Sequence, residues 1–121
     1  MDNWETPKWL MDIFEGWFDP CPLNPNPTID GLSIEWKDKT YVNPPYSKPL
    51  EWVEKAIEEN KKGKTIVMLL RMDTSTKWFR LLQEAGAVFL WVNGRLKFEC
   101  PTYEKPYLAA FPSMLVVLRT S

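Results

Sequence analysis

The residues best suited to chemistry are Asn43, Pro44, Pro45 and Tyr46, which stand in one uninterrupted tetrapeptide. The Asn43 side chain offers a carbonyl acceptor. The prolines fix φ near about −65°, so the Pro44 carbonyl is held in place as a second acceptor. Tyr46 supplies a flat face on which a base or an amide can stack. Together these groups would hold a planar amino group.

Such a grip would also make the amino group reactive. An exocyclic amine is a poor nucleophile because its lone pair is conjugated into the ring, and two acceptors on its N–H groups favour a pyramidal nitrogen with a released lone pair. No strong base is needed, since the methylated amine loses its proton readily once positive. The tetrapeptide therefore predicts amino methylation. The alternative interpretation is a plain turn, because Asn and Pro are the commonest turn residues.

The neighbouring sequence places this tetrapeptide at the edge of a sheet. A short β-prone run, 40–42, ends at Asn43. Residues 49–60 then carry Leu50, Val53 and Ile57 at helical spacing behind a proline at the first turn. A motif between the end of a strand and the start of a helix lies at the carboxyl edge of an α/β sheet, where ligands bind.

The rest of the chain alternates between helical and strand patterns. The predicted elements are a helix over 6–15, a central buried strand over 65–70, a helix over 74–85, a buried strand over 87–92, a turn at 93–94 with a return strand over 95–98, and a last strand over 114–118. This order predicts one α/β domain over residues 1–121, with no separate target-recognition domain.

Composition excludes several classes of protein. The 121 residues include no histidine, so Ser-His-Asp, Cys-His and His-rich metal sites are ruled out. Cys21 and Cys100 have no paired spacing that would indicate a disulfide framework. The sequence has no run of about 18 apolar residues and no secretory signal, so we expect no membrane partner and a cytoplasmic protein, in a cell or an infected host. The net charge of −1 indicates no global basic field for nucleic acid.

The order and spacing of many short motifs resemble the phage-type DNA N-6-adenine methyltransferases, a family that uses S-adenosyl-L-methionine. The likeness covers nearly the whole chain. Besides residues 43–47, it rests on Trp4-x-Thr6-Pro7, Phe18-Asp19-Pro20-Cys21, Asp30-Gly31-Leu32 with Trp36, residues 52–56, Leu69-Leu70, residues 74–79, 94–98 and 111–115. The resemblance implies a minimal, trimmed Rossmann-like methyltransferase sheet, mixed and mostly parallel, that transfers a methyl group to the N6 amine of a flipped-out adenine.

The order also resembles the gamma-type amino methyltransferases, in which cofactor elements precede the catalytic motif. Carried over residue by residue, Asn43, Pro44, Pro45 and Tyr46 would form the catalytic loop. The cofactor residues would be Thr6 and Pro7 at the methionine end, Asp19, Pro20 and Cys21 as a degenerate first cofactor motif, and Asp30 at the cofactor adenine. Thr6 also reads as a helix N-cap, and the two aspartates also read as turn-capping loop acids.

Four residues are candidates for contacts with DNA: Ser47, Arg71, Arg95 and Lys97. The basic ones have a second interpretation as ordinary solvated charges. Of the four, Arg95 is the residue we would test first.

The sequence also departs from the pattern of the family. No glycine follows Cys21, the acidic residue expected at the cofactor ribose is not identifiable, and Arg71 stands where relatives tend to show proline. A homodimer would supply the missing surface. Two alternatives stay open: an amino methyltransferase acting on RNA bases or protein glutamine, and a non-catalytic module that binds single-stranded nucleic acid in an aromatic cleft.

Overall fold

The computed structural model describes residues 8–21, 30–45, 47–91, 97–98, 107–108 and 112–120. Its helices are α1 (Lys8–Ile13), α2 (Pro49–Lys61) and α3 (Lys77–Glu84). The strands are β1 (Lys39–Val42), β2 (Thr65–Arg71), β3 (Val88–Trp91), β4 (Lys97–Phe98), β5 (Tyr107–Leu108) and β6 (Ser113–Leu118). The predicted α/β class is confirmed.

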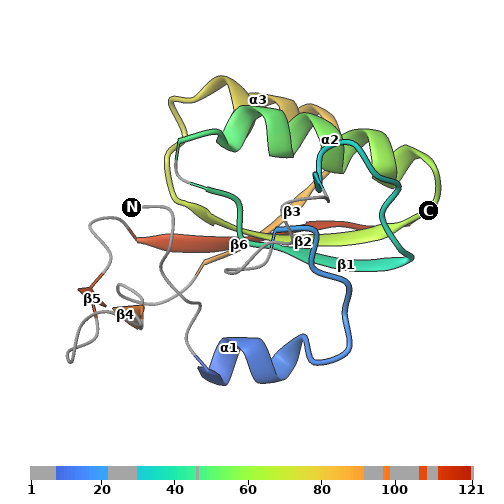
Figure 1. Cartoon of the computed structure of the whole chain (residues 1–121). Helices are drawn as coiled ribbons and strands as arrows, with labels where there is room; N and C mark the ends of the chain where they lie inside the picture. The colour runs from blue at the N-terminus through green and yellow to red at the C-terminus, as the bar shows by residue number, and fades with distance from the viewer. Residues whose placement is uncertain are drawn as a thin grey trace.

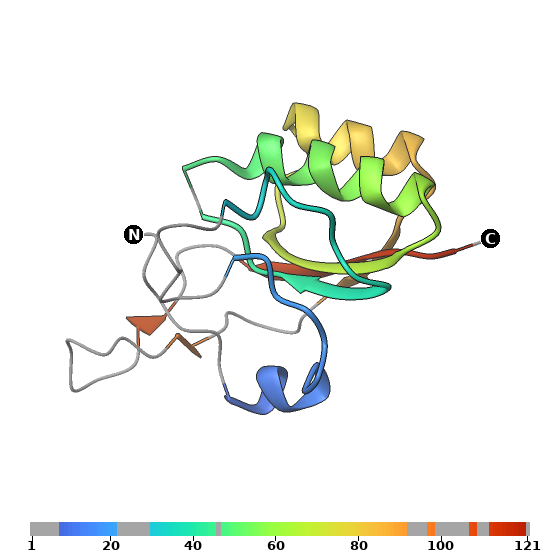
Figure 2. The same ribbon diagram turned by 45° about the vertical axis from the view of Figure 1, so that its right-hand side comes forward.

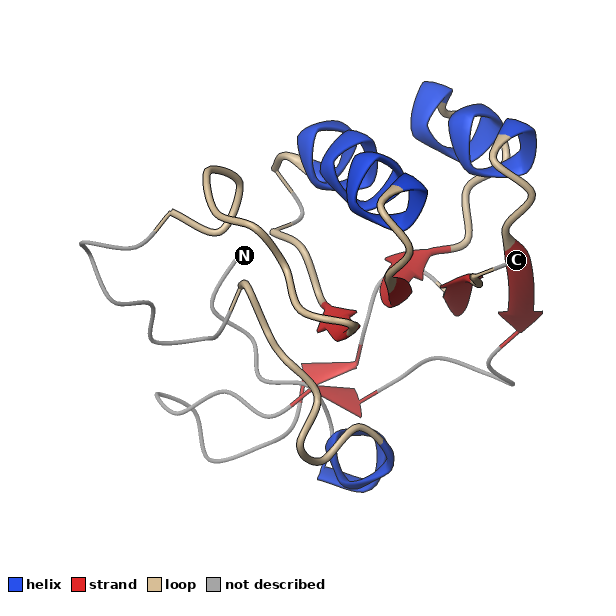
Figure 3. Cartoon of the chain, turned by 90° about the vertical axis from the view of Figure 1, so that its right-hand side faces the viewer, coloured by secondary structure: helices blue, strands red, loops and turns tan. Residues whose placement is uncertain are grey.

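The main sheet has four strands in the order β1-β2-β6-β3, and β4 pairs with β5 in a separate two-stranded sheet. Helices α2 and α3 lie side by side on one face of the main sheet, and α1 lies on the other (Figures 1 and 2). Figure 3 shows the same three layers from the side.

The expectation of a mostly parallel sheet is not supported. Among the named strands that the structure describes, β1 and β2 are the one pair that runs parallel, whereas β6 runs antiparallel to both of its neighbours, β2 and β3. The cause is the insertion of the last strand between two strands that precede it in the chain. The sheet is therefore mixed.

Strand β2 shows why the centre of the sequence is so apolar. Ile66, Met68 and Leu70 face the core beneath α2 and α3, whereas Val67 and Leu69 face the cluster around α1. A strand covered on both faces carries a nearly continuous apolar run rather than an alternating one. The prediction of a central buried strand at 65–70 is confirmed.

Two finer expectations are wrong. The strand predicted over 87–92 was expected to be buried, but β3 is an edge strand whose Leu90 and Trp91 are exposed. The first helix also ends earlier than predicted, because α1 stops at Ile13 and not at residue 15. Leu10 is buried, while Trp9 and Ile13 are exposed. The predicted turn at 93–94 lies outside the described residues, and Lys97–Phe98 pairs with β5.

A buried carboxylate ties α2 to the sheet and to the segment before β1. Glu59 is fully buried, and its Oε1 accepts hydrogen bonds from the backbone N–H of Trp36 at 2.7 Å and from Lys64 Nζ at 2.6 Å. Its Oε2 accepts from Lys62 Nζ at 2.9 Å. Burial alone would raise the pKa of Glu59, but the hydrogen bonds from Lys64, Lys62 and Trp36 outweigh it and lower the pKa to about 2.

We predict that Glu59→Gln lowers the free energy of unfolding at pH 7 by about 3 kcal/mol, because it leaves buried Lys64 with a weaker partner. The folded-state pKa of Glu59 lies below its ordinary value of 4.5. The stabilising contribution is therefore complete above that value and is lost as the pH falls toward 2. Urea unfolding across this pH range measures the effect.

The matched control is Glu58→Gln, because Glu58 is exposed and lies 3.8 Å from Lys62. Exposed ion pairs contribute little, so this variant should stay within about 0.5 kcal/mol of the parent. Two results would contradict this role of ionised Glu59. One is an equal loss of unfolding free energy in the two variants. The other is a difference in unfolding free energy between the parent and Glu59→Gln that does not become smaller at acid pH.

Candidate functional site

The carboxyl ends of β1 and β2 meet at one edge of the sheet because the two strands are parallel. Val42, the last residue of β1, is in register with Met68, and Leu69, Leu70 and Arg71 complete β2 beyond that level. The residues that follow β1, beginning with Asn43, therefore lie beside the end of β2. This is the edge at which α/β proteins bind ligands.

Prolines rigidify the connection from β1 to α2. Pro44 is buried, Asn43 and Pro45 are half-buried, and Pro49 stands at the start of α2. The Pro45 carbonyl accepts from the backbone N–H of Lys48 at 3.2 Å, which closes the turn before the helix. The Pro45 carbonyl therefore already accepts a hydrogen bond within the turn. It is not one of the acceptors predicted from the sequence, which are the Asn43 side chain and the Pro44 carbonyl. Tyr46 lies outside the described residues.

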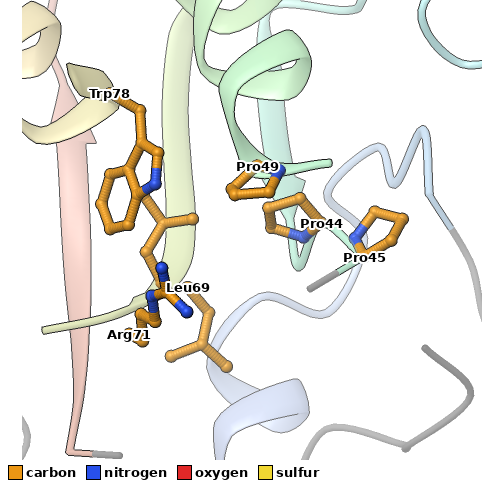
Figure 4. Close-up of a pocket in the computed structure, with 7 residues that line it drawn as sticks. Pro44, Pro45, Pro49, Leu69, Arg71 and Trp78 are labelled. Atoms are coloured by element: carbon orange, nitrogen blue, oxygen red, sulfur yellow. The ribbon is translucent and has the colours of Figure 1, made fainter. Parts of the chain in front are cut away.

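A pocket opens beside these prolines (Figure 4). It is an open pocket whose empty space, with the solvent at its mouth included, amounts to about 280 Å³. Its lining residues are Pro44, Pro45, Pro49, Leu69, Leu70, Arg71 and Trp78. Six of these seven side chains carry no charge, and Arg71 supplies the cation. An apolar slot with a few polar groups is typical of a site for a small planar group.

Arg71 is oriented by a neighbouring acid. Its Nη2 lies 3.6 Å from Asp73 Oδ2, and both side chains are one-third exposed. Asp73 Oδ1 accepts from the backbone N–H and the hydroxyl of Ser75, at 3.1 and 2.6 Å. The hydroxyl and the N–H of Ser75 lower the pKa of Asp73, with a further contribution from Arg71. The carboxylate is thus fixed in place and stays ionised beside the pocket.

The segment predicted as a first cofactor motif adds to the other side of β1. Phe18 forms an isolated parallel bridge with Thr40, with hydrogen bonds from Phe18 N to Lys39 O and from Tyr41 N to Phe18 O. Because the bridge is parallel, the chain runs from Phe18 through Asp19 toward the same carboxyl edge as Asn43. Asp19 Oδ1 accepts from Cys21 N at 2.9 Å, and burial raises the pKa of Asp19 against that hydrogen bond.

Asp30 lies on a second turn that packs against the first. Its carboxylate accepts from Leu32 N at 3.0 Å and from the Ser33 hydroxyl at 2.8 Å, and the Ser33 bond is the main cause of its lowered pKa. Gly31 is buried, and a Cβ there would clash with the Pro20 carbonyl oxygen. The two acid-bearing turns are therefore in contact through Gly31 and Pro20. The turn-capping role of both acids is confirmed, and their contact with a cofactor stays a prediction.

Most of the site residues that were predicted from the sequence and that the structure describes lie near the carboxyl edge of the main sheet. Pro44, Pro45 and Arg71 line the pocket, and Asn43 directly precedes Pro44 in the chain. Asp19, Pro20, Cys21 and Asp30 form the adjacent pair of turns. Ser47 is exposed in the turn before α2. Lys97 lies in β4, with no description of its side chain, and Thr6, Pro7 and Arg95 lie outside the described residues.

Pro49, Trp78 and Gly31 were not singled out as site residues in the sequence. Pro49 and Trp78 reach the pocket from the starts of two helices that follow β1 and β2, and Gly31 allows the two turns to touch. The order of strands and helices could have indicated Pro49 and Trp78, because each βα unit places the first turn of its helix over the carboxyl end of its strand.

Among the residues that the structure describes, no helix is long and apolar enough to cross a membrane. Within the same part of the chain, no cluster of three or more acidic or cysteine side chains is arranged to hold a metal ion.

Comparisons with known proteins point to one family. A family model described as DNA N-6-adenine-methyltransferase (Dam) matches residues 1–121. The chain is 34% identical over 114 residues to the DNA N-6-adenine-methyltransferase of Haemophilus phage HP1, covering 80% of this chain and 66% of the relative. It is 30% identical over 110 residues to the protein of the same name from Escherichia phage T1, covering 78% of this chain and 46% of the relative. The chain thus spans less than two thirds of either relative. No solved structure matches it.

Proposed function

The chain belongs to the DNA N-6-adenine-methyltransferase (Dam) family, and on that premise we propose that it transfers a methyl group from S-adenosyl-L-methionine to the N6 amine of a flipped-out adenine in DNA. The observation that carries the proposal is the position of residues 43–45. They follow β1 at the carboxyl edge, and Pro44 and Pro45 line the mostly apolar pocket. The sheet would be a trimmed Rossmann-like sheet with β6 inserted.

The proposed chemistry needs positioning rather than a strong base. The Asn43 side-chain oxygen and the Pro44 carbonyl accept from the two N–H groups of the target amine, and Tyr46 stacks on the extruded base. Acceptors that are held rigidly by the prolines favour the pyramidal amine of the transition state without reorganising. The amine nitrogen would then form the new N–C bond as the C–S bond of the methyl donor breaks and its thioether leaves. The positively charged product amine would lose its extra proton to solvent.

We predict that Asn43→Ala lowers methyl transfer by at least about a hundredfold, because it removes one of the two acceptors that activate the amine. The measurement is incorporation of labelled methyl from S-adenosylmethionine into unmethylated DNA, with protein and RNA as parallel substrates. Asn60→Ala is a suitable control, since Asn60 lies in α2 and donates to the carbonyls of Lys64 and Arg119.

Unchanged transfer by Asn43→Ala would contradict the catalytic role. Transfer to RNA or to protein glutamine instead of DNA would favour the alternative amino methyltransferase. If the parent neither transfers methyl groups nor binds the cofactor, the chain acts as a nucleic-acid-binding module.

The cofactor is placed on the two touching turns, with Asp19, Pro20, Cys21 and Asp30 as its proposed contacts and Thr6 and Pro7 near its methionine end. The supporting observation is the Gly31–Pro20 contact, which holds the turns together on the side of residue 43 away from β2. A methyl donor bound there would approach the amine across the catalytic loop.

We predict that Gly31→Ala weakens the calorimetrically measured binding of S-adenosylmethionine at least tenfold, because the added methyl group would clash with the Pro20 carbonyl oxygen and push the turns apart. The control is Gly63→Ala, which has φ of +98° and open space around its Cβ. That variant loses about 1–3 kcal/mol of stability through backbone strain alone. If Gly31→Ala bound the cofactor as well as Gly63→Ala does, the placement would be wrong.

DNA contact is proposed for Arg71 at the pocket mouth, and for Ser47, Arg95 and Lys97. With a net charge of −1 on the whole chain, local cations must neutralise the phosphates near the target base. A homodimer is the proposed source of further recognition surface, and sedimentation with and without DNA would reveal it.

We predict that Arg71→Gln weakens DNA binding about equally on all sequences and makes the salt dependence of log K shallower by about one, as expected for one lost phosphate contact. Arg80→Gln makes the same charge change on an exposed position of α3 outside the pocket. Fluorescence anisotropy over a salt series measures both. A slope that Arg71→Gln leaves unaltered would show that Arg71 does not contact phosphate.

A further inference from the structure

Trp78 forms one wall of the pocket and is 4% exposed. It belongs to the core that α2 and α3 form with the sheet. Figure 4 shows the nitrogen-bearing edge of its indole ring turned toward Pro49 and Pro44 across the pocket. The ring is thus anchored by packing, while its polar edge faces the site.

The indole N–H of Trp78 has no hydrogen-bond partner among the residues that the structure describes. Trp36 shows the usual arrangement, since its indole N–H donates to the Gly31 carbonyl at 2.8 Å. The Trp78 indole nitrogen is itself reached by solvent in the pocket and is not sealed in the core. A ligand that displaces this water must offer an acceptor in its place. A donor that is left facing a pocket points to an acceptor on the ligand.

The prolines and leucines of the pocket wall have no polar side-chain atom, and a tryptophan N–H can only donate. Adenine presents two ring nitrogens, N1 and N7, as acceptors on either side of its N6 amine. An amine held by Asn43 and Pro44 would leave one of these nitrogens available to the opposite wall.

We propose that the Trp78 indole N–H donates a hydrogen bond to a ring nitrogen of the target adenine and so fixes the rotation of the base within the pocket. This inference rests on the proposed function. A single stacking face lets a base rotate in its plane, whereas one hydrogen bond at its edge points the amine at the two acceptors. Trp78 is therefore a base-orienting residue, distinct from the acceptors that activate the amine.

The test is Trp78→Phe, which keeps an aromatic ring and removes the donor. Trp91→Phe is the matched control, because Trp91 is exposed at the end of β3 and does not line the pocket. Substrates are duplexes whose target base is adenine, 1-deazaadenine, 3-deazaadenine or 7-deazaadenine, each analogue lacking one ring acceptor.

On adenine, Trp78→Phe should lower kcat/KM about tenfold, and Trp91→Phe should leave it unchanged. The parent and Trp78→Phe should have equal kcat/KM on just one deaza analogue, because that analogue already lacks the ring nitrogen that accepts from the Trp78 N–H. A Trp78→Phe rate equal to that of the parent on adenine, or the same loss on every analogue, would overturn the proposal and leave Trp78 as a packing residue.

A second measurement does not depend on catalysis or on the folding of a variant. In the parent protein, the indole N–H resonance of Trp78, assigned by triple-resonance NMR, should shift downfield with an adenine-containing duplex and not with the same duplex carrying an abasic target. Equal shifts with both duplexes would refute the hydrogen bond. Absence of methyl transfer by the parent would instead refute the proposed function, and the NMR result would still decide the role of Trp78.

Discussion

The parallel pairing of β1 with β2 is the constraint on which the site depends. It places Asn43 and Arg71 at one edge although they are separated by a helix in the sequence. Both strands are held from two sides, since residues of β2 alternate between the cluster beneath α2 and α3 and the cluster around α1. Stacking of Phe14 on Tyr41, with ring centroids 4.5 Å apart, adds to the second cluster. The edge is therefore rigid where the chemistry needs fixed acceptors.

The Glu59 network secures this arrangement from the opposite end of α2. It joins the backbone of Trp36 to Lys64, the residue before β2, so the segment before β1 and the start of β2 share one anchor. Trp36 in turn stacks with Trp52 and donates to the Gly31 carbonyl. The Glu59 carboxylate, near the C-terminal end of α2, thus helps to position the turns proposed for the cofactor through Trp36.

The sequence predicted best where local chemistry decides the outcome. The proline at the start of α2, the apolar run of β2 and the strand that ends at Asn43 are all present as expected. Prediction failed where the structure depends on pairing between strands that are far apart in the sequence. Nothing in residues 113–118 reveals that β6 inserts between β2 and β3. For the same reason, the sequence did not show that Trp91 lies exposed on an edge strand. The same holds for the site. Asn43 was recognisable from its neighbours, but the pocket walls at Leu69 and Trp78 come together only in the fold.

The most direct test of the central claim is the identity of the methylated product. DNA treated with the protein and S-adenosylmethionine would be digested to nucleosides and analysed by mass spectrometry against authentic standards. The account predicts N6-methyladenine as the product. Methyl groups found only on another nucleoside, or on protein glutamine and not on DNA, would contradict it, because the acceptors at Asn43 and Pro44 would then serve a different amine.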